Sequence, residues 1–523
     1  MKNLIFCHNT NYLNDLYDKI KNEKKKYFEN SVIFLQSKYE ESNLNQKIKE
    51  KAITYIQKSD GFFPKFDNFE INSKILQECS DIELTFYSMF DYYEFDNFKI
   101  GSKDKRISYY YYLNNLINLV KKYNLVSVYF THVPHTLVEV LVLKYFEKKN
   151  LKVIITRGLP IPELYKLENN ISKIDKSDNE IDNYKDGSDE IIENFISKYK
   201  KNFDSLDDNN NWVNYNLIKS YNKLHILKYF LLIIFPIFFT LKFFFRLSAI
   251  IIKSFITWVN DNINKTNKIN EYINLRSIFY SKNNYIHLAN LNKFNLEKIF
   301  YYGHLSKNKN LFLYKKLTKK IDFNERYFFF PMWFQPSSTT YPFAERYIDY
   351  ELSLQILSKN LPDNCFIYVK ESPDIFNISN HAWFKGNFIR DRKFYQNISK
   401  IPKVKLVDFK IKDFELIDNS DAVVSLSDKF SIISIIRNKP HISFVDTLCS
   451  KVETSFYCFD ENKLKEAINK ILNIGVKFND KENENFFKWL KKVSFYRSTN
   501  KGLNKMTFKN DFDKIAHILG KRI

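Results

Sequence analysis

Continuous apolar runs alternate with segments of helical spacing along most of the chain. The apolar runs cover residues 3–8, 31–37, 125–130, 151–156, 327–334, 365–370, 404–409, 421–427 and 441–445. Between several of them apolar residues recur every three or four positions, as in 136–149 and 342–359. Strands of a parallel sheet are apolar throughout because helices cover both faces. The pattern predicts an α/β protein with two Rossmann-like, doubly wound domains.

The clearest unit is the strand–helix–strand segment 327–373. Ligands of such sheets bind at the carboxyl ends of the strands, where helix N-termini present free N–H groups. The polar loops 335–340 and 370–373 fall there. Further predicted elements are strands at 82–89 and 285–289 and helices at 189–201, 414–419, 430–438, 462–472 and 484–492.

The same pattern, together with a polar segment and an apolar segment between the two sets of strands, divides the chain into five parts. We predict an N-terminal domain (1–165), a polar flexible linker (166–212), a membrane-associated helical segment (213–262), a C-terminal domain (263–480) and basic C-terminal helices (481–523). The linker is rich in Asn, Asp, Ser and Lys and has few large apolar groups.

The segment 229–259 is overwhelmingly apolar, but its uninterrupted run ends at Leu241. That run is shorter than the ~20 residues that a spanning helix needs. On a helix, Lys228, Lys242, Arg246 and Lys253 fall within an arc of about 40°, opposite an apolar field. We therefore expect this helix to lie in the interface of an anionic membrane surface. A single span and a helix of the soluble core are the alternatives.

The chain has 81 Lys and Arg against 60 Asp and Glu, a net charge of +21. This balance favours an anionic partner, although it also fits a general drift towards Lys and Asn. The five cysteines show no metal-ligand or disulfide spacing, so no metal is expected and the protein is predicted to be cytoplasmic. With nine glycines, the chain has no P-loop and no G-x-G-x-x-G motif. Nucleic-acid binding has only charge and aromatics in its favour, and we do not expect it.

The segment Thr131-His132-Val133-Pro134-His135 follows a predicted strand and precedes a predicted helix. Its imidazoles and Glu139 are expected near the cleft, where a general base acts. His135 and Glu139 are the predicted catalytic residues. The alternative is that the histidines only shape the turn.

Several motifs occur in the order found in bacterial capsular polysaccharide biosynthesis proteins, and the chain resembles that family. The residues that match are Gln335, Pro336, Thr339 and Thr340 of an aromatic-strand turn, Lys370, Glu371 and Pro373 of a Lys-Glu-x-Pro turn, Arg390, Tyr395, Glu415, Ser420, Arg437, Lys439 and Pro440. The resemblance implies a GT-B-like glycosyltransferase, with residues 1–165 as its acceptor domain and residues 263–480 as its donor domain. It implies donor or phosphate contacts from the residues Gln335, Thr339, Thr340, Lys370, Glu371, Arg390 and Tyr395. Ser427, at the end of a predicted strand, is predicted to join them.

The sequence also departs from the family pattern. Ser372 stands in place of a histidine, Ser337 in place of a glutamate, and a glycine-rich stretch is replaced by 428–434, which includes Ile433. We predict a cytoplasmic-face glycosyltransferase of surface-polysaccharide assembly that transfers a sugar from a nucleotide donor to a lipid-linked or polysaccharide acceptor without a cofactor. The alternative hypothesis is a scaffold or binding protein of the same pathway with a decayed donor site.

Overall fold

The computed structural model describes most of both predicted domains. The described residues are 2–7, 10–35, 41–56, 68, 70–89, 102–134, 137–161, 163–169, 188–201, 310–333, 344–376, 390, 392–497 and 512–523. The predicted interfacial helix and the predicted strand at 285–289 lie outside them. Among the described helices, none has the length and apolar character needed to cross a membrane.

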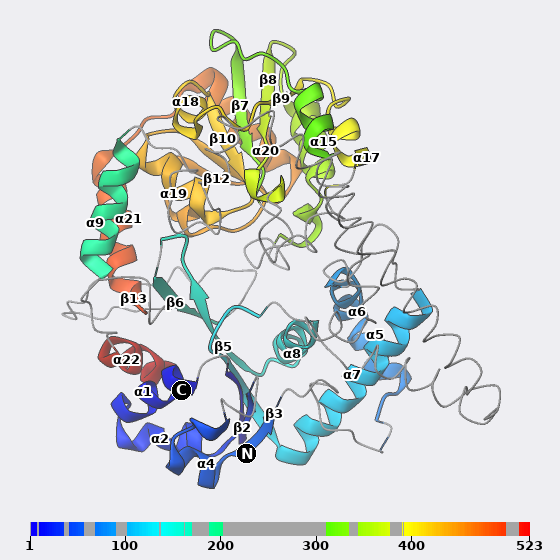
Figure 1. Ribbon diagram of the computed structural model, residues 1–523, viewed down its shortest axis with the longest axis vertical. Coiled ribbons are helices and arrows are strands. Elements are labelled where there is room, and N and C mark those ends of the chain that lie inside the picture. The colour runs from blue at the N-terminus through cyan, green and yellow to red at the C-terminus, as the bar shows by residue number, and fades with distance from the viewer. Residues whose placement is uncertain are drawn as a thin grey trace, which may run out of the picture.

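The first sheet has seven strands in the order β13-β6-β5-β4-β1-β2-β3 (Figure 1). Its strands are β1 (Lys2–Cys7), β2 (Ser31–Leu35), β3 (Ile53–Ile56), β4 (Leu125–Phe130), β5 (Lys152–Gly158), β6 (Leu164–Glu168) and β13 (Ser494–Tyr496). β1 to β5 are parallel, whereas β6 pairs antiparallel with both β5 and β13. From β3 to β6 the order is the Rossmann order 3-2-1-4-5-6.

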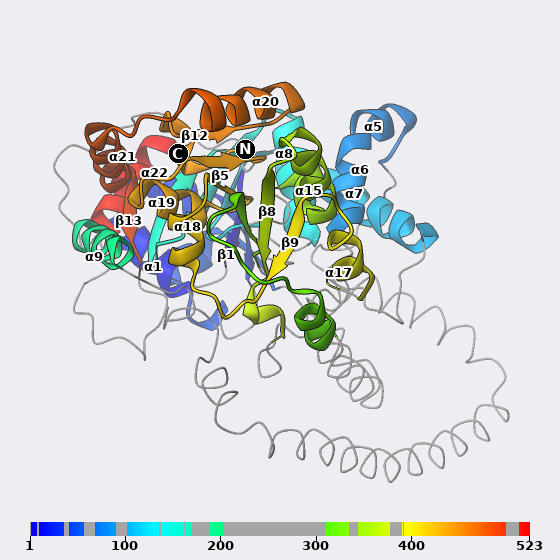
Figure 2. The same cartoon turned by 90° about the horizontal axis from the view of Figure 1, so that it is seen from above.

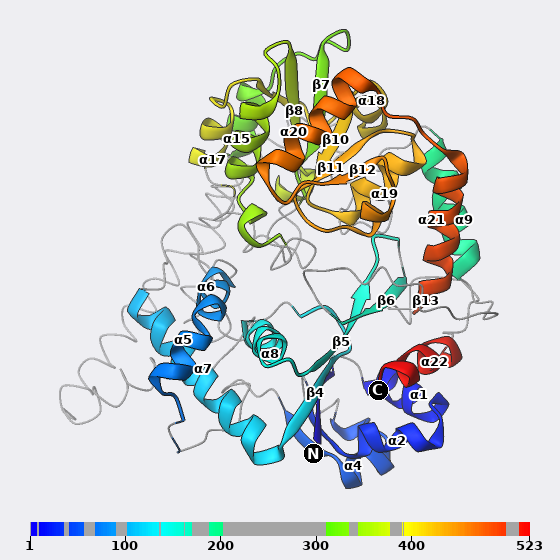
Figure 3. The same ribbon diagram turned by 180° about the vertical axis from the view of Figure 1, so that it is seen from behind.

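Helices cover both faces of the first sheet (Figure 3). One face carries α5 (Ser73–Glu78), α6 (Ser80–Ser88), α7 (Ser102–Tyr123) and α8 (Leu137–Lys148). The other carries α1 (Thr10–Lys19), α2 (Asn22–Glu29), α4 (Gln46–Lys51) and α22 (Phe512–Arg522). Phe6, Phe34 and Phe130 stack in the core between neighbouring strands. The chain's last helix therefore completes its first domain.

The second sheet has six parallel strands in the order β12-β11-β10-β7-β8-β9. They are β7 (Arg326–Pro331), β8 (Cys365–Lys370), β9 (Val404–Val407), β10 (Ala422–Ser425), β11 (His441–Ser443) and β12 (Ser455–Tyr457). From β9 to β12 this is again the order 3-2-1-4-5-6. The prediction of two Rossmann-like α/β domains is confirmed.

Helices also cover both faces of the second sheet (Figure 2). One face carries α15 (Tyr350–Asn360), α17 (Arg392–Ile398) and α20 (Glu461–Asn469), with residues 310–317 also helical. The other carries α18 (Asp413–Asp418), α19 (Asp428–Ile436), α21 (Asp480–Val493) and, from earlier in the chain, α9 (Ser188–Lys200). Short turns complete the domain: η3 (Glu345–Ile348), η4 (Pro373–Phe376), η5 (Leu448–Lys451) and the π turn η6 (Lys470–Ile474).

One predicted element is wrong, and another is interrupted. Residues 82–89, predicted as a strand, form most of helix α6, in which Ile82 and Phe86 are buried four residues apart, on one helical face. The predicted helix 342–359 is, in its described part, the turn η3 followed by α15. Asp349 separates the two, because its side chain accepts hydrogen bonds from the N–H groups of Glu351 and Leu352 as the N-cap of α15.

Four strands escaped prediction. β3, β6, β12 and β13 are each five residues or shorter, and none forms a long apolar run. They lie at or next to the edges of the sheets. The sequence signal for such strands is correspondingly weak.

Candidate functional site between the two sheets

Each sheet has a topological switch point, where successive connections leave in opposite directions. In the first sheet it lies between β1 and β4, and in the second between β7 and β10. Ligands of open α/β sheets bind outside the carboxyl ends of the strands at these points. Arg157, at the end of β5, contacts Asp428, which follows β10, so carboxyl-end loops of the two sheets meet. Strand order and this contact together therefore indicate a candidate site between the two sheets.

Thr131, His132 and Glu139 form the first sheet's side of the site. His132 follows β4, and its Nε2 lies 3.0 Å from Oε1 of Glu139 on α8. The Glu139 carboxyl is fully buried, whereas the His132 side chain is 18% exposed. Protonation of His132 would make this contact an ion pair, so the fold brings a buried carboxylate and a partly accessible imidazole together. His135 lies outside the described residues.

Arg497 reaches the same place from the C-terminal end of the chain. Its Nη1 donates to the carbonyl of Thr131 at 2.8 Å, and its guanidinium lies 3.8 Å from the centroid of the Tyr12 ring. Sequence reasoning missed Arg497, because 366 residues separate it from Thr131 and only the pairing of β13 with β6 brings it there. It places a buried cation beneath the loop that follows β4.

Ser427, Asp428 and Lys429 form the second sheet's side, at the start of α19. Ser427 occupies the N-cap position but its side chain accepts no capping hydrogen bond. Its hydroxyl is buried and has no partner among the described residues. The helix has nine residues. The N–H groups of a helix's first turn have no acceptor within the helix, and together with the partial positive charge of the N-terminus they attract anions. Lys429 is buried with its ammonium 5.3 Å from the Trp333 ring centroid, just after β7.

Asp428 connects this helix start to the rest of the molecule. Its Oδ2 accepts from Arg157 Nη2 at 2.8 Å, and its Oδ1 accepts from the backbone N–H of Leu448 at 2.9 Å. Arg157 offsets the negative charge that Asp428 brings to the helix N-terminus. The N–H groups of α19 therefore remain electrostatically suited to a further anion.

A buried chain of hydrogen bonds lies behind Ser427. Ser425 Oγ donates to the Ser427 carbonyl at 3.1 Å and lies 2.9 Å from His441 Nε2, while His441 Nδ1 lies 3.1 Å from Ser455 Oγ. Complete burial lowers the pKa of His441 to about 3, so the ring is neutral. Because the Ser425 hydroxyl donates its proton to the Ser427 carbonyl, it can only accept from His441. We therefore assign the His441 proton to Nε2. The chain fixes the backbone at the start of α19.

The family-motif residues after β8 form closed, buried pairs. Lys370 Nζ donates to Asp413 Oδ1 at 2.7 Å and to the Ile411 carbonyl at 2.5 Å, and both charged side chains are less than 5% exposed. Glu371 accepts from Arg390 Nε and from the Tyr395 hydroxyl, each at 2.9 Å. Burial raises the pKa of the Glu371 carboxyl despite these partners. The Arg390 guanidinium lies over the rings of Tyr350 and Phe394 at 4.6 and 4.5 Å.

The remaining predicted site residues fall outside the described part of the chain. They are His135, Gln335, Thr339 and Thr340 of the site, and Lys228, Lys242, Arg246 and Lys253 of the membrane contact. Within the described ranges, no cluster of three or more His, Cys, Asp or Glu side chains could hold a metal ion.

Comparisons with known proteins give only remote matches. No family model matches, and no curated protein sequence matches. One similar solved structure is KpsC, a beta Kdo 2,7 transferase of Thermosulfurimonas dismutans, with 14% identity, 43% of this chain covered and a TM-score of 0.21. The match spans 65% of that protein's length. Another is the UDP-GlcNAc 2-epimerase of Methanocaldococcus jannaschii, with 11% identity, full coverage of both chains and a TM-score of 0.22. At such TM-scores neither structure supports an argument, and the assignment of the fold rests on strand order.

Proposed function

We propose that the protein is a glycosyltransferase that uses a nucleotide sugar, with the donor phosphates bound at the N-terminus of α19. The observation that carries the proposal is the buried, unpartnered hydroxyl of Ser427 at that N-terminus, beside Lys429 and at the switch point of the second sheet. Free N–H groups, a hydroxyl and an ammonium are the groups that bind a phosphate in proteins. The resemblance of segment 327–445 to capsule-biosynthesis proteins supports the sugar-transfer chemistry.

The first sheet supplies the acceptor side of this proposal. A transferred sugar requires a base that removes the acceptor hydroxyl proton and positive charge that stabilises the leaving phosphate. We assign the base to His135, with Glu139 and His132 beside it, and the phosphate contacts to α19, Lys429 and the predicted turn residues Gln335, Thr339 and Thr340. Lys370, Glu371, Arg390 and Tyr395 act in this proposal by holding the neighbouring loop. No metal or cofactor is included.

The basic stripe Lys228, Lys242, Arg246 and Lys253 places the enzyme, in this proposal, at the cytoplasmic face of the membrane. There it would meet a lipid-linked or growing polysaccharide acceptor. An amphipathic helix with one cationic face binds anionic headgroups in this way. Sedimentation with anionic vesicles, compared with a protein in which the four cations are replaced by glutamine, tests this part separately.

A scaffold function is a second candidate, and the start of α19 gives it specific support. Phe430, Ile432 and Ile433, which replace the family's glycine-rich stretch, are all buried in the core. These side chains offer a nucleotide no hydrogen bonds. A scaffold would bind pathway partners without binding a nucleotide sugar.

The deciding experiment measures thermal stabilisation of the full chain by CMP-, UDP- and GDP-linked sugars. We expect one nucleotide class to raise the melting temperature saturably, and Ser427→Ala and Lys429→Met to weaken that binding at least fivefold. Ser434→Ala is the matched control, because it removes a buried hydroxyl from the same helix that bonds only to the Phe430 carbonyl. No stabilisation by any of the sugars would favour the scaffold.

Transfer itself is tested with the ligand so identified. We expect His135→Ala to abolish sugar transfer while leaving nucleotide binding intact. Full transfer activity in His135→Ala would remove this residue from the catalytic role.

A further inference from the structure

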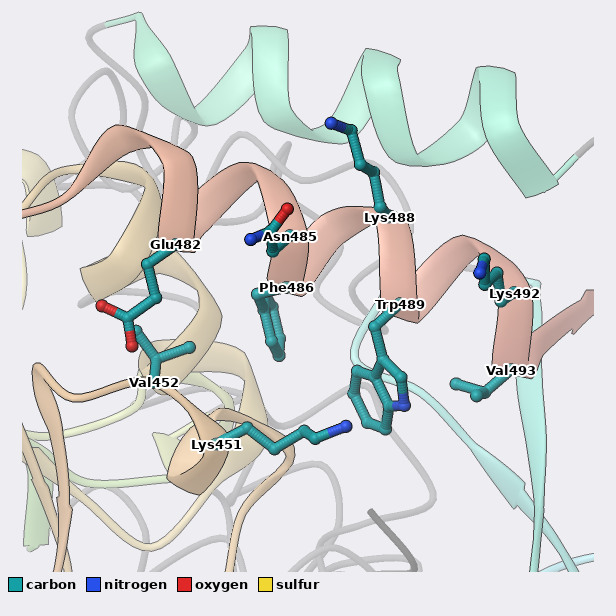
Figure 4. Close-up of a pocket in the computed structure, with 9 residues that line it drawn as sticks. All are labelled: Lys451, Val452, Glu482, Asn485, Phe486, Lys488, Trp489, Lys492 and Val493. Atoms are coloured by element: carbon teal, nitrogen blue, oxygen red, sulfur yellow. The ribbon is translucent and has the colours of Figure 1, made fainter. Parts of the chain in front are cut away.

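A groove of about 430 Å³ runs along α21, on the flank of the molecule where the two domains join (Figure 4). Its lining residues are Lys451, Val452, Glu482, Asn485, Phe486, Lys488, Trp489, Lys492 and Val493. Lys451 ends η5 of the second domain, whereas Val493 leads directly into β13 of the first sheet. A volume of this size falls in the usual range of small-ligand sites, ~300–1,000 Å³.

The groove has an excess of positive charge. Three of its lining residues are lysines and one is acidic, and the acid, Glu482, already accepts a hydrogen bond from the backbone N–H of Glu453. Lys488 is 69% exposed and lies 3.8 Å from Glu484, a long contact that leaves its ammonium available to solvent. The floor between the lysines is apolar, made by Phe486, Val452 and Val493. This combination suits an anion that also has apolar surface.

One buried hydrogen-bond donor that lines the groove has no partner among the described residues. Trp489 is 7% exposed, and its indole N–H has no acceptor among the described residues. Figure 4 shows the indole between the Lys451 ammonium and Val493, with its nitrogen on the side of Val493. Ser494, which follows Val493 but is not among the lining residues, also has a buried hydroxyl without a partner among the described residues. A buried unsatisfied donor costs ~1–3 kcal/mol, which an oxygen-rich ligand could recover.

From these features we propose that the groove binds a carboxylate-bearing oligosaccharide, as a second contact for the acidic glycan chain that the enzyme extends. The assignment to a glycan rests on the proposed function, whereas the preference for an oxygen-rich anion rests on the groove itself. A sugar ring supplies apolar C–H faces for the floor and hydroxyl or carboxylate oxygens for the lysines and the indole.

The surroundings of Trp489 argue against two other occupants. Nucleic-acid bases bind such grooves by stacking on aromatic faces, but Lys451 and Lys166 already lie over the Trp489 ring, at 4.3 and 5.7 Å from its centroid. A membrane surface would require exposed apolar side chains. None of the large apolar side chains exposed in the described part of the chain lines this groove.

The groove is also linked to the candidate donor site. η5 begins at Leu448, whose N–H donates to Asp428, the first residue of α19, and ends at Lys451 in the groove. Asp428 in turn holds Arg157 of the first sheet. A chain bound between Lys451 and Lys492 would therefore contact both domains next to the segment that joins them.

Calorimetric titration of the full chain with hexagalacturonate, as a carboxylated probe, and with maltohexaose, as a neutral one of equal length, tests the proposal. We expect saturable binding of the acidic hexamer only, weakening as NaCl is raised from 50 to 300 mM. Lys451→Gln/Lys492→Gln should lower the affinity at least tenfold, and Trp489→Phe should lower it severalfold because the N–H is lost while a smaller aromatic ring remains.

The matched control is Lys463→Gln/Lys465→Gln, which removes the same charge from α20, outside the groove. An equal loss of affinity in this control would show a general charge effect and overturn the proposal. So would no binding of the acidic hexamer, equal binding of maltohexaose, displacement by equimolar inorganic phosphate, or tighter binding of oligo(dT).

The nucleotide-sugar assay on the same proteins separates this proposal from the proposed function. If both are correct, Lys451→Gln/Lys492→Gln keeps nucleotide binding and Ser427→Ala keeps binding of the hexamer. Failure of hexamer binding with intact nucleotide binding overturns the groove alone. Failure of nucleotide binding with intact hexamer binding overturns the donor site alone.

Discussion

Two polar clusters at the carboxyl edge of the second sheet differ in how completely their groups are paired. After β8, Lys370 pairs with Asp413, and Arg390 and Tyr395 both bond Glu371. After β10, Ser427 has a hydroxyl without a partner and α19 has an uncapped N-terminus. The first cluster matches a family motif and the second does not. The difference shows that residue identity finds polar groups, whereas topology and pairing show which of them can still bind a ligand.

The comparison predicts its largest effect at Arg390. Arg390→Met leaves Glu371 buried without its ion pair, and we expect the free energy of unfolding to fall by about 3–5 kcal/mol. Urea denaturation measures the change, with the exposed substitution Lys400→Gln as the control. A change below ~1 kcal/mol, together with loss of nucleotide binding, would break the comparison by making Arg390 a ligand contact.

The next effect is a pH dependence from His441. Its pKa is about 3 in the folded protein and near 6.5 in the unfolded chain, so only the unfolded state takes up the proton between these values. The contribution of His441 to the free energy of unfolding is therefore fully present above pH 6.5. It falls by about 1.4 kcal/mol for each pH unit below that value. Urea midpoints from pH 7 to pH 4.5 measure the slope.

His441→Asn sharpens this test because it removes the titrating group and keeps an amide for Ser425. In this variant unfolding should take up one proton fewer than in the parent protein, so the free energy of unfolding should depend less steeply on pH. An unchanged slope would assign the pH dependence to groups other than His441.

A smaller effect is expected at the ion pair between the two sheets. Arg157 and Asp428 are each 11% exposed, so Arg157→Gln should cost about 1–2 kcal/mol, between the values for exposed and fully buried pairs. The control Lys491→Gln removes the partner of Glu193, whose side chain is 68% exposed, and should cost less than Arg157→Gln because solvent screens the pair. Equal losses of unfolding free energy in the two variants would show that the Arg157–Asp428 pair contributes no more to stability than an exposed pair.

The smallest effect on stability belongs to Ser427→Ala. The hydroxyl has no partner to lose, so we expect the free energy of unfolding to change by less than ~0.5 kcal/mol or to rise slightly. Thermal and urea denaturation measure it beside Ser434→Ala, which should destabilise more because its hydroxyl bonds the Phe430 carbonyl. A larger loss for Ser427→Ala would mean that the hydroxyl is already used for folding.

The sequence by itself determined the fold class and the central strands. Apolar runs such as 125–130 and 365–370 are buried on both faces, and burial on both faces is what a continuous run encodes. It also identified Ser427, Lys370 and Glu371 as polar groups at strand ends. It failed at residues 82–89, because a short apolar stretch without a breaker suits a helix as well as a strand.

Only the tertiary structure decided which polar groups meet. The partners of Lys370, Glu371 and Arg157 lie 43, 19 and 271 residues away, and Arg497 reaches Thr131 across 366 residues. Such contacts depend on strand order and on the return of the chain through β13, which no local spacing encodes. The sequence determines which polar side chains lie at the strand ends. Only the packed chain determines which of them have partners, and this distinguishes a structural ion pair from a candidate binding site.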